Sequence, residues 1–169
     1  MTKKISLHDF QSYLAARLAG TGNQSSAGLL GIQAGPDYWL LDLADSGEIV
    51  PLTPLTSVPL TLPWFAGVAN IRGNLYSVVD LAAFLGKEPT PQNASSRLLL
   101  IGTRHGSNAA LLVTRMIGLR NVEALHPEAA DTAAPTWAQE SYSDNEGRRW
   151  KKLKVRELLA DEAFMDIGV

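Results

Sequence analysis

Few side chains in the sequence have the type and spacing needed for catalysis or metal binding. The three histidines, His8, His105 and His126, are far apart, and none has a carboxylate at metal-ligand spacing beside it. Cysteine is absent, which excludes thiolate metal sites, disulfides and cysteine nucleophiles. The sequence also lacks a glycine-rich phosphate-binding loop and the GxSxG nucleophile motif. We therefore expect no metal site and no nucleophilic active site.

Two pairs of neighbouring carboxylates remain as candidates for acid–base chemistry. They are Asp42 with Asp45 and Asp161 with Glu162. General acid–base catalysis requires carboxyl groups in unequal, shielded environments, whereas these residues lie in segments expected to be solvated turns or helices. A structural role is favoured for both pairs, so the sequence predicts neither an enzyme nor a cofactor.

A basic cluster from Arg148 to Lys154 is the one feature that suggests a nucleic-acid ligand. Trp150 lies among five cationic residues there and could stack on a base. Side chains of a strand alternate between faces, however, so Leu153 and Val155 would face the core while the lysine stems cover Trp150. A small barrel that binds single-stranded nucleic acid is therefore kept only as the alternative from another functional class.

The composition is typical of a soluble globular domain. Of 169 residues 46% are hydrophobic and 19% charged, and 15 Lys and Arg against 17 Asp and Glu give a net charge of -2. No global field attracts nucleic acid or an anionic membrane. The apolar runs at 98–101 and 109–113 are far shorter than the roughly 20 residues of a membrane-spanning helix, and the N-terminus lacks the apolar stretch of a signal peptide. We expect a cytoplasmic protein without direct membrane insertion.

Residues 1–26 are expected to form an N-terminal helix and a linker. Apolar side chains recur at helical spacing and predict a helix over 7–19, and the small polar stretch TGNQSSAG follows it. From Gly28 onward, short apolar segments cut by Gly, Pro, Asn and Asp predict strands. The predicted strands are 28–34, 38–43, 48–53, 66–71, 74–79, 97–102, 108–114, 117–122, 139–143 and 148–154.

This pattern predicts a mostly antiparallel β protein with closed barrels and short helices. A first β unit is expected at about 27–86 and a second at about 97–155, joined by the proline-containing connector 87–96. Residues 126–135 are expected to form a surface loop. Short helices are predicted at 80–85 and at about 155–165.

The most informative stretch is PWFAGVANIRGNLYSVVDLAAFLG, residues 63–86. Two strands flank a tight turn at Arg72, Gly73 and Asn74, where Gly73 would supply a positive φ. Arg72 is then held at a hairpin tip, where its planar guanidinium is suited to contact a partner's carboxylate or carbonyl groups. Asp80 is expected to be the N-cap of the following helix.

This stretch resembles the signature of the CheW family, the adaptor proteins of bacterial chemosensory arrays. That pattern runs approximately (F/W)-x-x-G-V-x-N-(L/I)-R-G, followed by an apolar strand that ends V-x-D-L. Ten positions of this sequence fall on it: Phe65, Gly67, Val68, Asn70, Ile71, Arg72, Gly73, Val78, Asp80 and Leu81. Segments on both sides also resemble the family, from about Gly28 to Leu159. Ser77 and Thr114 depart from its pattern, which often has Pro and Asp there.

The resemblance implies two SH3-like five-stranded β-barrel subdomains over residues 27–165, without a catalytic centre. It implies binding to a methyl-accepting chemoreceptor and to a CheA-type histidine kinase, in receptor arrays at the inner face of the membrane. By the family pattern, the partner-binding residues are Asn70, Arg72 and Gly73, with Asp45 and Glu48 as further candidates. Weak self-association is left open.

The run from Met116 to Arg120 and the N-terminal extension are most similar to the PilI branch of this family. That branch is associated with twitching motility by type IV pili. A flagellar chemotaxis adaptor is the alternative within the same family.

Overall fold

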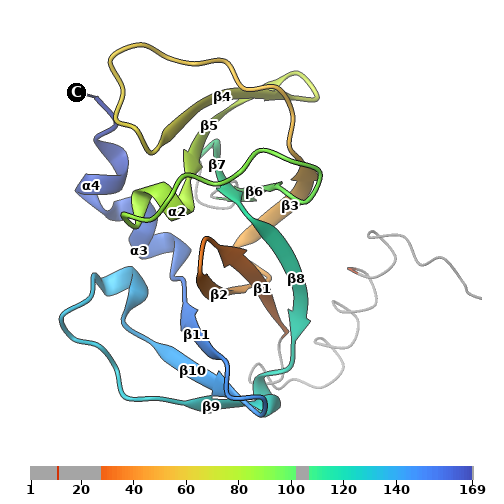
Figure 1. The fold of residues 1–169 in the computed structure, drawn as a ribbon, viewed down its shortest axis with the longest axis vertical. Coiled ribbons are helices and arrows are strands. Elements are labelled where there is room, and N and C mark those ends of the chain that lie inside the picture. The colour runs from red at the N-terminus through yellow and green to blue at the C-terminus, as the bar shows by residue number, and fades with distance from the viewer. Residues whose placement is uncertain (1–10, 12–27, 102–106, 169) are drawn as a thin grey trace, which may run out of the picture.

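The computed structural model describes residues 11, 28–101 and 107–168, which fold mainly into strands arranged in two sheets (Figure 1). One sheet has six strands in the order β8-β1-β2-β11-β10-β9, and the other has five in the order β3-β6-β7-β5-β4. The mostly β, two-subdomain architecture is confirmed, although one sheet has six strands where five were expected. The predicted helix over 7–19 lies outside the described residues, apart from residue 11.

Most strands and helices lie at or near the residue ranges predicted from the sequence. The strands of the six-stranded sheet are β1 (Leu29–Ala34), β2 (Asp37–Asp42), β8 (Arg115–Arg120), β9 (Leu125–Pro127), β10 (Ser141–Asp144) and β11 (Arg149–Lys152). Those of the five-stranded sheet are β3 (Ser46–Pro51), β4 (Phe65–Ile71), β5 (Asn74–Asp80), β6 (Arg97–Ile101) and β7 (Ala109–Val113). The helices are α2 (Leu81–Phe84), α3 (Val155–Ala160) and α4 (Glu162–Met165), with 3-10 turns η3 (Val122–Ala124) and η4 (Thr136–Ala138).

The two sheets are not built from two consecutive parts of the chain. This corrects the expected β units at 27–86 and 97–155. β1 and β2 form a hairpin, but β1 also pairs with β8, and β2 pairs in parallel with β11. β3 then crosses to the other sheet and pairs with β6. Apolar periodicity marks where strands lie but not which strands pair, so this interleaving was not visible in the sequence.

The uninterrupted apolar runs of β6 and β7 are explained by burial on both faces of the sheet. In β6, Leu98 and Leu100 point into the core of the five-stranded sheet, whereas Leu99 and Ile101 point into a core shared with the six-stranded sheet. β7 divides its side chains in the same way. Strands buried on both faces read as continuous hydrophobic runs, as these two do.

The five-stranded sheet is closed by the segment that follows β3. Thr56 forms an isolated bridge with Val68 of β4, through two backbone hydrogen bonds of 2.9 Å. β3 and β4 are the two edges of the sheet, so this bridge pairs the β4 edge with the segment that leaves the β3 edge. Gly67 permits the approach, because a Cβ there would lie 2.5 Å from the Thr56 carbonyl oxygen and its φ is +130°.

Asp80 caps α2 as predicted. Its side chain also binds the connector, residues 87–96, to the end of β5. It accepts a hydrogen bond from the Ala83 N–H at 3.4 Å. The same carboxylate accepts from the Thr90 N–H at 2.8 Å and from the Thr90 hydroxyl at 2.6 Å. Both Asp80 and Thr90 are buried. The sequence indicated the cap, but not this attachment of the connector to the sheet.

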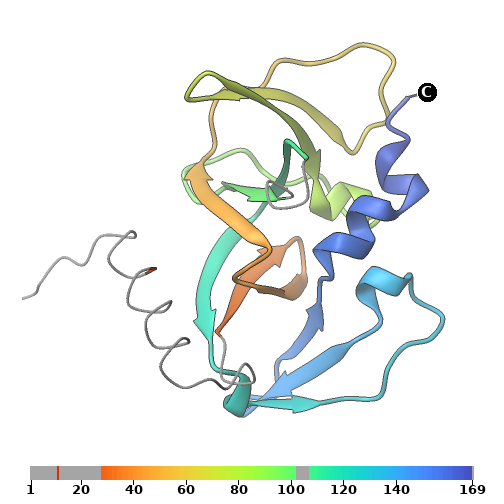
Figure 2. The ribbon, with the colours of Figure 1, turned by 180° about the vertical axis from the view of Figure 1, so that it is seen from behind.

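Two predictions for the C-terminal part are corrected in their details. The helix expected at 155–165 is divided into α3 and α4 by Asp161, whose extended backbone ends α3 and whose side chain accepts from the Ala163 N–H to cap α4. The surface loop expected at 126–135 is confirmed for residues 128–135, whereas His126 and Pro127 belong to β9, where His126 pairs with Ser143 of β10. The helices α2, α3 and α4 gather on one side of the molecule, where the two sheets meet (Figure 1 and Figure 2).

Candidate protein-binding surface

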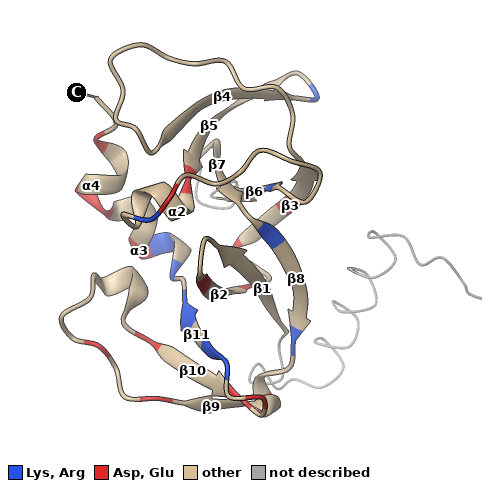
Figure 3. Ribbon diagram, in the orientation of Figure 1, with Lys and Arg blue, Asp and Glu red and all other residues tan. Residues whose placement is uncertain are grey.

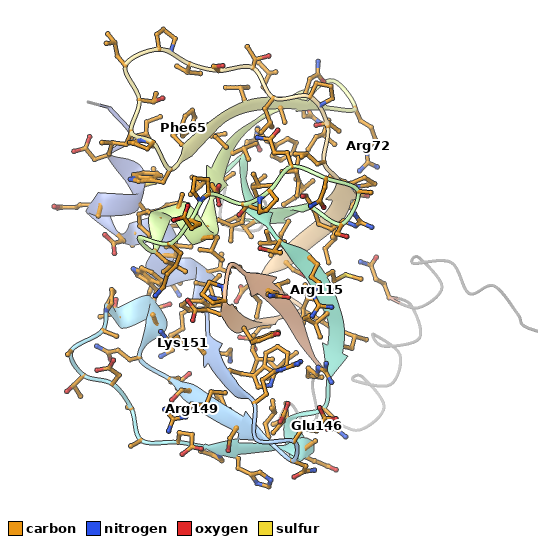
Figure 4. The ribbon with its side chains drawn as sticks, in the orientation of Figure 1. Phe65, Arg72, Arg115, Glu146, Arg149 and Lys151 are labelled. Carbon is orange, nitrogen blue, oxygen red and sulfur yellow. The ribbon has the colours of Figure 1, made fainter. Side chains whose placement is uncertain are left out.

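The tip of the β4–β5 hairpin is a two-residue turn with both residues at positive φ. Arg72 has φ 53° and Gly73 has φ 86°, as in a type I′ turn, and Ile71 pairs with Asn74 directly beside it. The positive φ predicted for Gly73 is confirmed, whereas Asn74 belongs to the strand. Asn70 accepts a hydrogen bond from the Gly73 N–H through Oδ1 at 2.9 Å. The hairpin therefore ends in a tightly held turn that projects Arg72 (Figure 4).

The structure brings Arg72 together with Glu48, a second predicted site residue. The Arg72 guanidinium forms an ion pair with the Glu48 carboxylate on β3, and the two side chains are 67% and 37% exposed. Asp45 lies in the turn before β3, three positions before Glu48, where its backbone N–H donates to the Asp42 carbonyl oxygen at 3.0 Å. Arg72 thus presents its remaining N–H donors to solvent from a fixed position.

An exposed leucine beside the tip was missed by the sequence reasoning. Leu75 is 63% exposed, and it lies directly opposite Asn70 in the β4–β5 ladder. Directly opposite residues share a face of a sheet. The same alternation places Val79 on the face that the six-stranded sheet covers, so Leu75 reads as a core residue in the sequence. The six-stranded sheet does not extend over the hairpin tip, so Leu75 is in contact with solvent.

The nucleic-acid alternative assigned a stacking role to Trp150, and the structure contradicts it. Trp150 is completely buried, and its indole Nε1–H donates to Asp144 Oδ2 at 3.0 Å. A Cβ at Gly31 would lie 2.9 Å from this indole ring, so β1 packs directly on it. Leu153 and Val155 are buried as predicted. A buried indole cannot stack on a base.

The pKa of Asp144 is displaced from its ordinary value, and the cause is structural. The hydrogen bond from Trp150 lowers the pKa of Asp144 most strongly, against an opposing effect of desolvation. Backbone N–H groups of Arg148 and Glu146 and the charge of Arg148 lower it further. The carboxylate stabilises the β10–β11 turn and anchors the indole, and no substrate-facing role follows from these contacts.

The other candidate groups have local partners. Asp42 pairs with the Lys152 ammonium at 3.2 Å, and Asp161 accepts from the Trp137 indole N–H at 2.6 Å. His126 Nε2 lies 2.8 Å from Asn145 Oδ1, whereas His8 and His105 lie outside the described residues. Among the residues that the structure describes, no group of three or more His, Asp or Glu side chains is placed to hold a metal ion.

Thr114, one of the two departures from the family pattern, has a structural role. Its hydroxyl accepts a hydrogen bond from the Gly35 N–H at 2.9 Å, and its own N–H donates to the Gln33 carbonyl oxygen at 2.9 Å. These bonds connect the β7–β8 corner to the end of β1.

Within residues 28–101 and 107–168, no helix is long and apolar enough to cross a membrane.

Comparison with known proteins places this geometry in a family. The model of the CheW-like domain matches residues 28–163. Protein PilI of Pseudomonas aeruginosa is 31% identical over 98 residues, which are 58% of this chain and 54% of PilI. A probable chemotaxis protein CheW of Rhizobium etli is 29% identical over 82 residues, 48% of this chain and 53% of that protein.

The matched stretch spans about half the length of these curated relatives. The crystal structure of the scaffolding protein TtCheW from Thermoanaerobacter tengcongensis has the same fold, with a TM-score of 0.64 at 19% identity, over 76% of this chain and 89% of that one. The signature hairpin, the two-sheet architecture and the family match all agree, and the chain belongs to the CheW-like domain family.

Proposed function

We propose that this chain is a non-catalytic adaptor that couples methyl-accepting chemoreceptors to a CheA-type histidine kinase in a cytoplasmic signalling array. The observation that carries the proposal is the β4–β5 tip, where the signature motif forms a rigid projection with an exposed guanidinium. A projection held by a positive-φ turn and an edge-to-edge ion pair contributes binding energy and orientation.

The proposed contact surface combines charge with one apolar anchor. Arg72, Glu48 and Leu75 would touch the partner, whereas Asn70 and Gly73 hold the turn that positions them. Asp45 lies at the border of this surface. Binding hot spots in protein interfaces are enriched in arginine and surrounded by contacts of lower energy. Exchangeable partners require modest interfaces, at or below about 1,600 Å² of total buried surface.

We further propose that the output is twitching motility by type IV pili. The similarity to protein PilI at 31% identity supports this branch. The matches to CheW proteins of Rhizobium etli and Helicobacter pylori, at 29% and 28% identity, keep a flagellar chemotaxis adaptor as the second candidate. Deletion of the encoding sequence in its own bacterium separates the two, because loss of twitching with intact swimming supports the first and the reverse supports the second.

The adaptor proposal is tested by capture of both partners from extract of the source bacterium. Immobilised wild-type protein is expected to retain a chemoreceptor and a histidine kinase together, as identified by mass spectrometry. Leu75→Ser should reduce the capture of at least one partner. Met165→Ser is the matched control, since Met165 is 61% exposed on α4, away from the hairpin. Retention of neither partner by the folded wild-type protein would overturn the proposal.

A further inference from the structure

A pocket of about 670 Å³ lies beside α2, α3 and α4, where the two sheets meet. Its volume is within the range of about 300 to 1,000 Å³ that is typical of ligand sites. Strands β2 and β11 of the six-stranded sheet, the segment before β4, α2, η4 and the residues around α4 contribute to the wall. Its main lining residues are Trp39, Trp64, Phe84, Trp137, Lys151 and Asp161.

Aromatic rings in mutual contact form most of the pocket wall. The ring centroids of Trp39 and Trp137 are 6.1 Å apart, those of Trp137 and Phe84 5.7 Å, and those of Phe84 and Trp64 4.9 Å. Trp39 and Trp137 are almost completely buried, at 1% and 4% exposure. Rings that pack on one another lose little freedom when a ligand arrives, so the wall is preformed for an apolar group.

Two of the lining residues, Trp39 and Lys151, carry hydrogen-bond donors that have no acceptor among the described residues. The buried indole Nε1–H of Trp39 has no hydrogen-bond partner among the described residues. Lys151 pairs with Trp39 across the β11–β2 ladder, and its ammonium lies 5.6 Å from the centre of the Trp39 ring. The Trp39 Nε1 atom is closed to solvent, whereas Lys151 is exposed, so the Lys151 ammonium is the donor that an occupant can reach.

Lys151 is left unneutralised while its neighbours are paired. Lys152 forms an ion pair with Asp42 at 3.2 Å and Lys154 one with Glu140 at 3.8 Å, whereas Lys151 has no ion pair among the described residues. Figure 3 shows the basic residues following β11 toward α3. The cluster first considered for nucleic acid therefore leaves a free ammonium at the border of an aromatic pocket.

The pocket lining also includes two carboxylates, and that of Asp161 is satisfied by hydrogen bonds. Asp161 accepts hydrogen bonds from the Trp137 indole and from the Ala163 N–H, and Asp166 lies beside it in the lining. A carboxylate on an occupant would be repelled there and attracted to Lys151. The charge distribution thus fixes the orientation of an acidic, apolar ligand.

We propose that this pocket docks a segment of a partner protein in which bulky apolar side chains are flanked by an acidic residue. The apolar side chains lie on the aromatic wall, and the carboxylate pairs with the Lys151 ammonium. The pocket has room for more than one large side chain, as a peptide segment provides. Arg72 and Lys151 lie well apart on the molecule (Figure 4). The site is therefore separate from the hairpin surface.

The experiment uses the full chain labelled with 5-fluorotryptophan, whose four tryptophans give four ¹⁹F resonances. The probe is acetyl-Asp-Leu-Phe-Asp-amide, and the resonances are assigned with single Trp→Phe variants. We expect the peptide to shift the resonances of Trp39, Trp64 and Trp137 and to leave that of Trp150 in place, because Trp150 lies in a different core. The neutral peptide acetyl-Asn-Leu-Phe-Asn-amide should bind at least threefold more weakly.

Two charge variants complete the test. Lys151→Gln should weaken binding of the acidic peptide at least threefold, whereas Arg149→Gln, two positions away on β11 and outside the pocket lining, should leave it unchanged. Absence of any shift up to about 5 mM peptide, equal movement of all four resonances, or equal effects of the two variants would each overturn the proposal. Neither receptor nor kinase is involved, so failure here leaves the adaptor function standing.

Discussion

The ion pair between Arg72 and Glu48 joins the two opposite edges of the five-stranded sheet. Arg72 lies at the β4–β5 tip and Glu48 on β3, and β4 and β3 are first and last in the strand order. The Thr56–Val68 bridge connects the β4 edge to the segment that follows β3, through backbone hydrogen bonds. Closure of the sheet therefore places two predicted partner-binding residues side by side, although 24 positions separate them in the chain.

Gly67→Ala should destabilise the protein by about 3 kcal/mol. The new Cβ would lie 2.5 Å from the Thr56 carbonyl oxygen, and alanine at φ +130° adds backbone strain. Chemical denaturation followed by circular dichroism measures the change in the free energy of unfolding. Gly147→Ala is the matched control, because its φ is +84° with no atom within 4 Å of the new Cβ, and it should cost about 1 kcal/mol. Equal costs at the two positions would argue against sheet closure through Thr56.

Asp80→Ala should cost about 3 kcal/mol, since it removes the acceptor of three donors in a buried position. Thr90→Val tests the same contact from the other side and should cost about 1 kcal/mol, because the Thr90 N–H keeps its bond to Asp80. Hydrogen exchange of residues 87–96 provides the second readout. Faster exchange there in Asp80→Ala is expected, and unchanged protection would contradict the proposed attachment of the connector.

The sequence predicted the places of the strands better than their partners. Turn residues and apolar segments located β1, β4, β5 and β6 within one or two residues, because these signals are local. The parallel pairings of β2 with β11 and of β5 with β7 join segments far apart in the chain, and no local signal specifies them. The short strand β9 was missed for the related reason that three residues carry no recognisable period.

Asp144→Asn should destabilise the protein at neutral pH, and the difference from wild type should shrink in acid. The Trp150 hydrogen bond lowers the pKa of Asp144 in the folded protein below its unfolded value. The carboxylate therefore contributes stability above the unfolded pKa, near pH 4, and this contribution is lost as the pH falls through the lower folded pKa. Unfolding free energies of both proteins between about pH 2.5 and pH 7 measure the effect.

Glu146→Gln is the control for this comparison, because Glu146 is an exposed carboxylate of the same turn. Its cost should be small at every pH. A difference between Asp144→Asn and wild type that stays constant across the acid range would show that the Asp144 charge contributes nothing.

The candidate site was predictable where the backbone required a particular residue. Gly73 follows from turn chemistry, and Arg72 from its place in that turn. The contact of Arg72 with Glu48 and the exposure of Leu75 depend on where the sheet closes and where its cover ends, which are tertiary properties. For Trp150 the favoured structural interpretation is confirmed, since its ring is buried and the stacking alternative is excluded.

A charge exchange between Arg72 and Glu48 tests the central claim, that the hairpin tip binds partners, most directly. Arg72→Glu breaks the ion pair, and addition of Glu48→Arg restores it with the charges reversed toward solvent. We expect the double variant to unfold at the wild-type temperature, yet to bind the chemoreceptor and the kinase at least tenfold more weakly, a loss of about 1.4 kcal/mol. Calorimetric titration of each purified partner against both variants and wild type gives the numbers. Wild-type affinity of the double variant for both partners would contradict the account, because Arg72 would then act only within its own barrel.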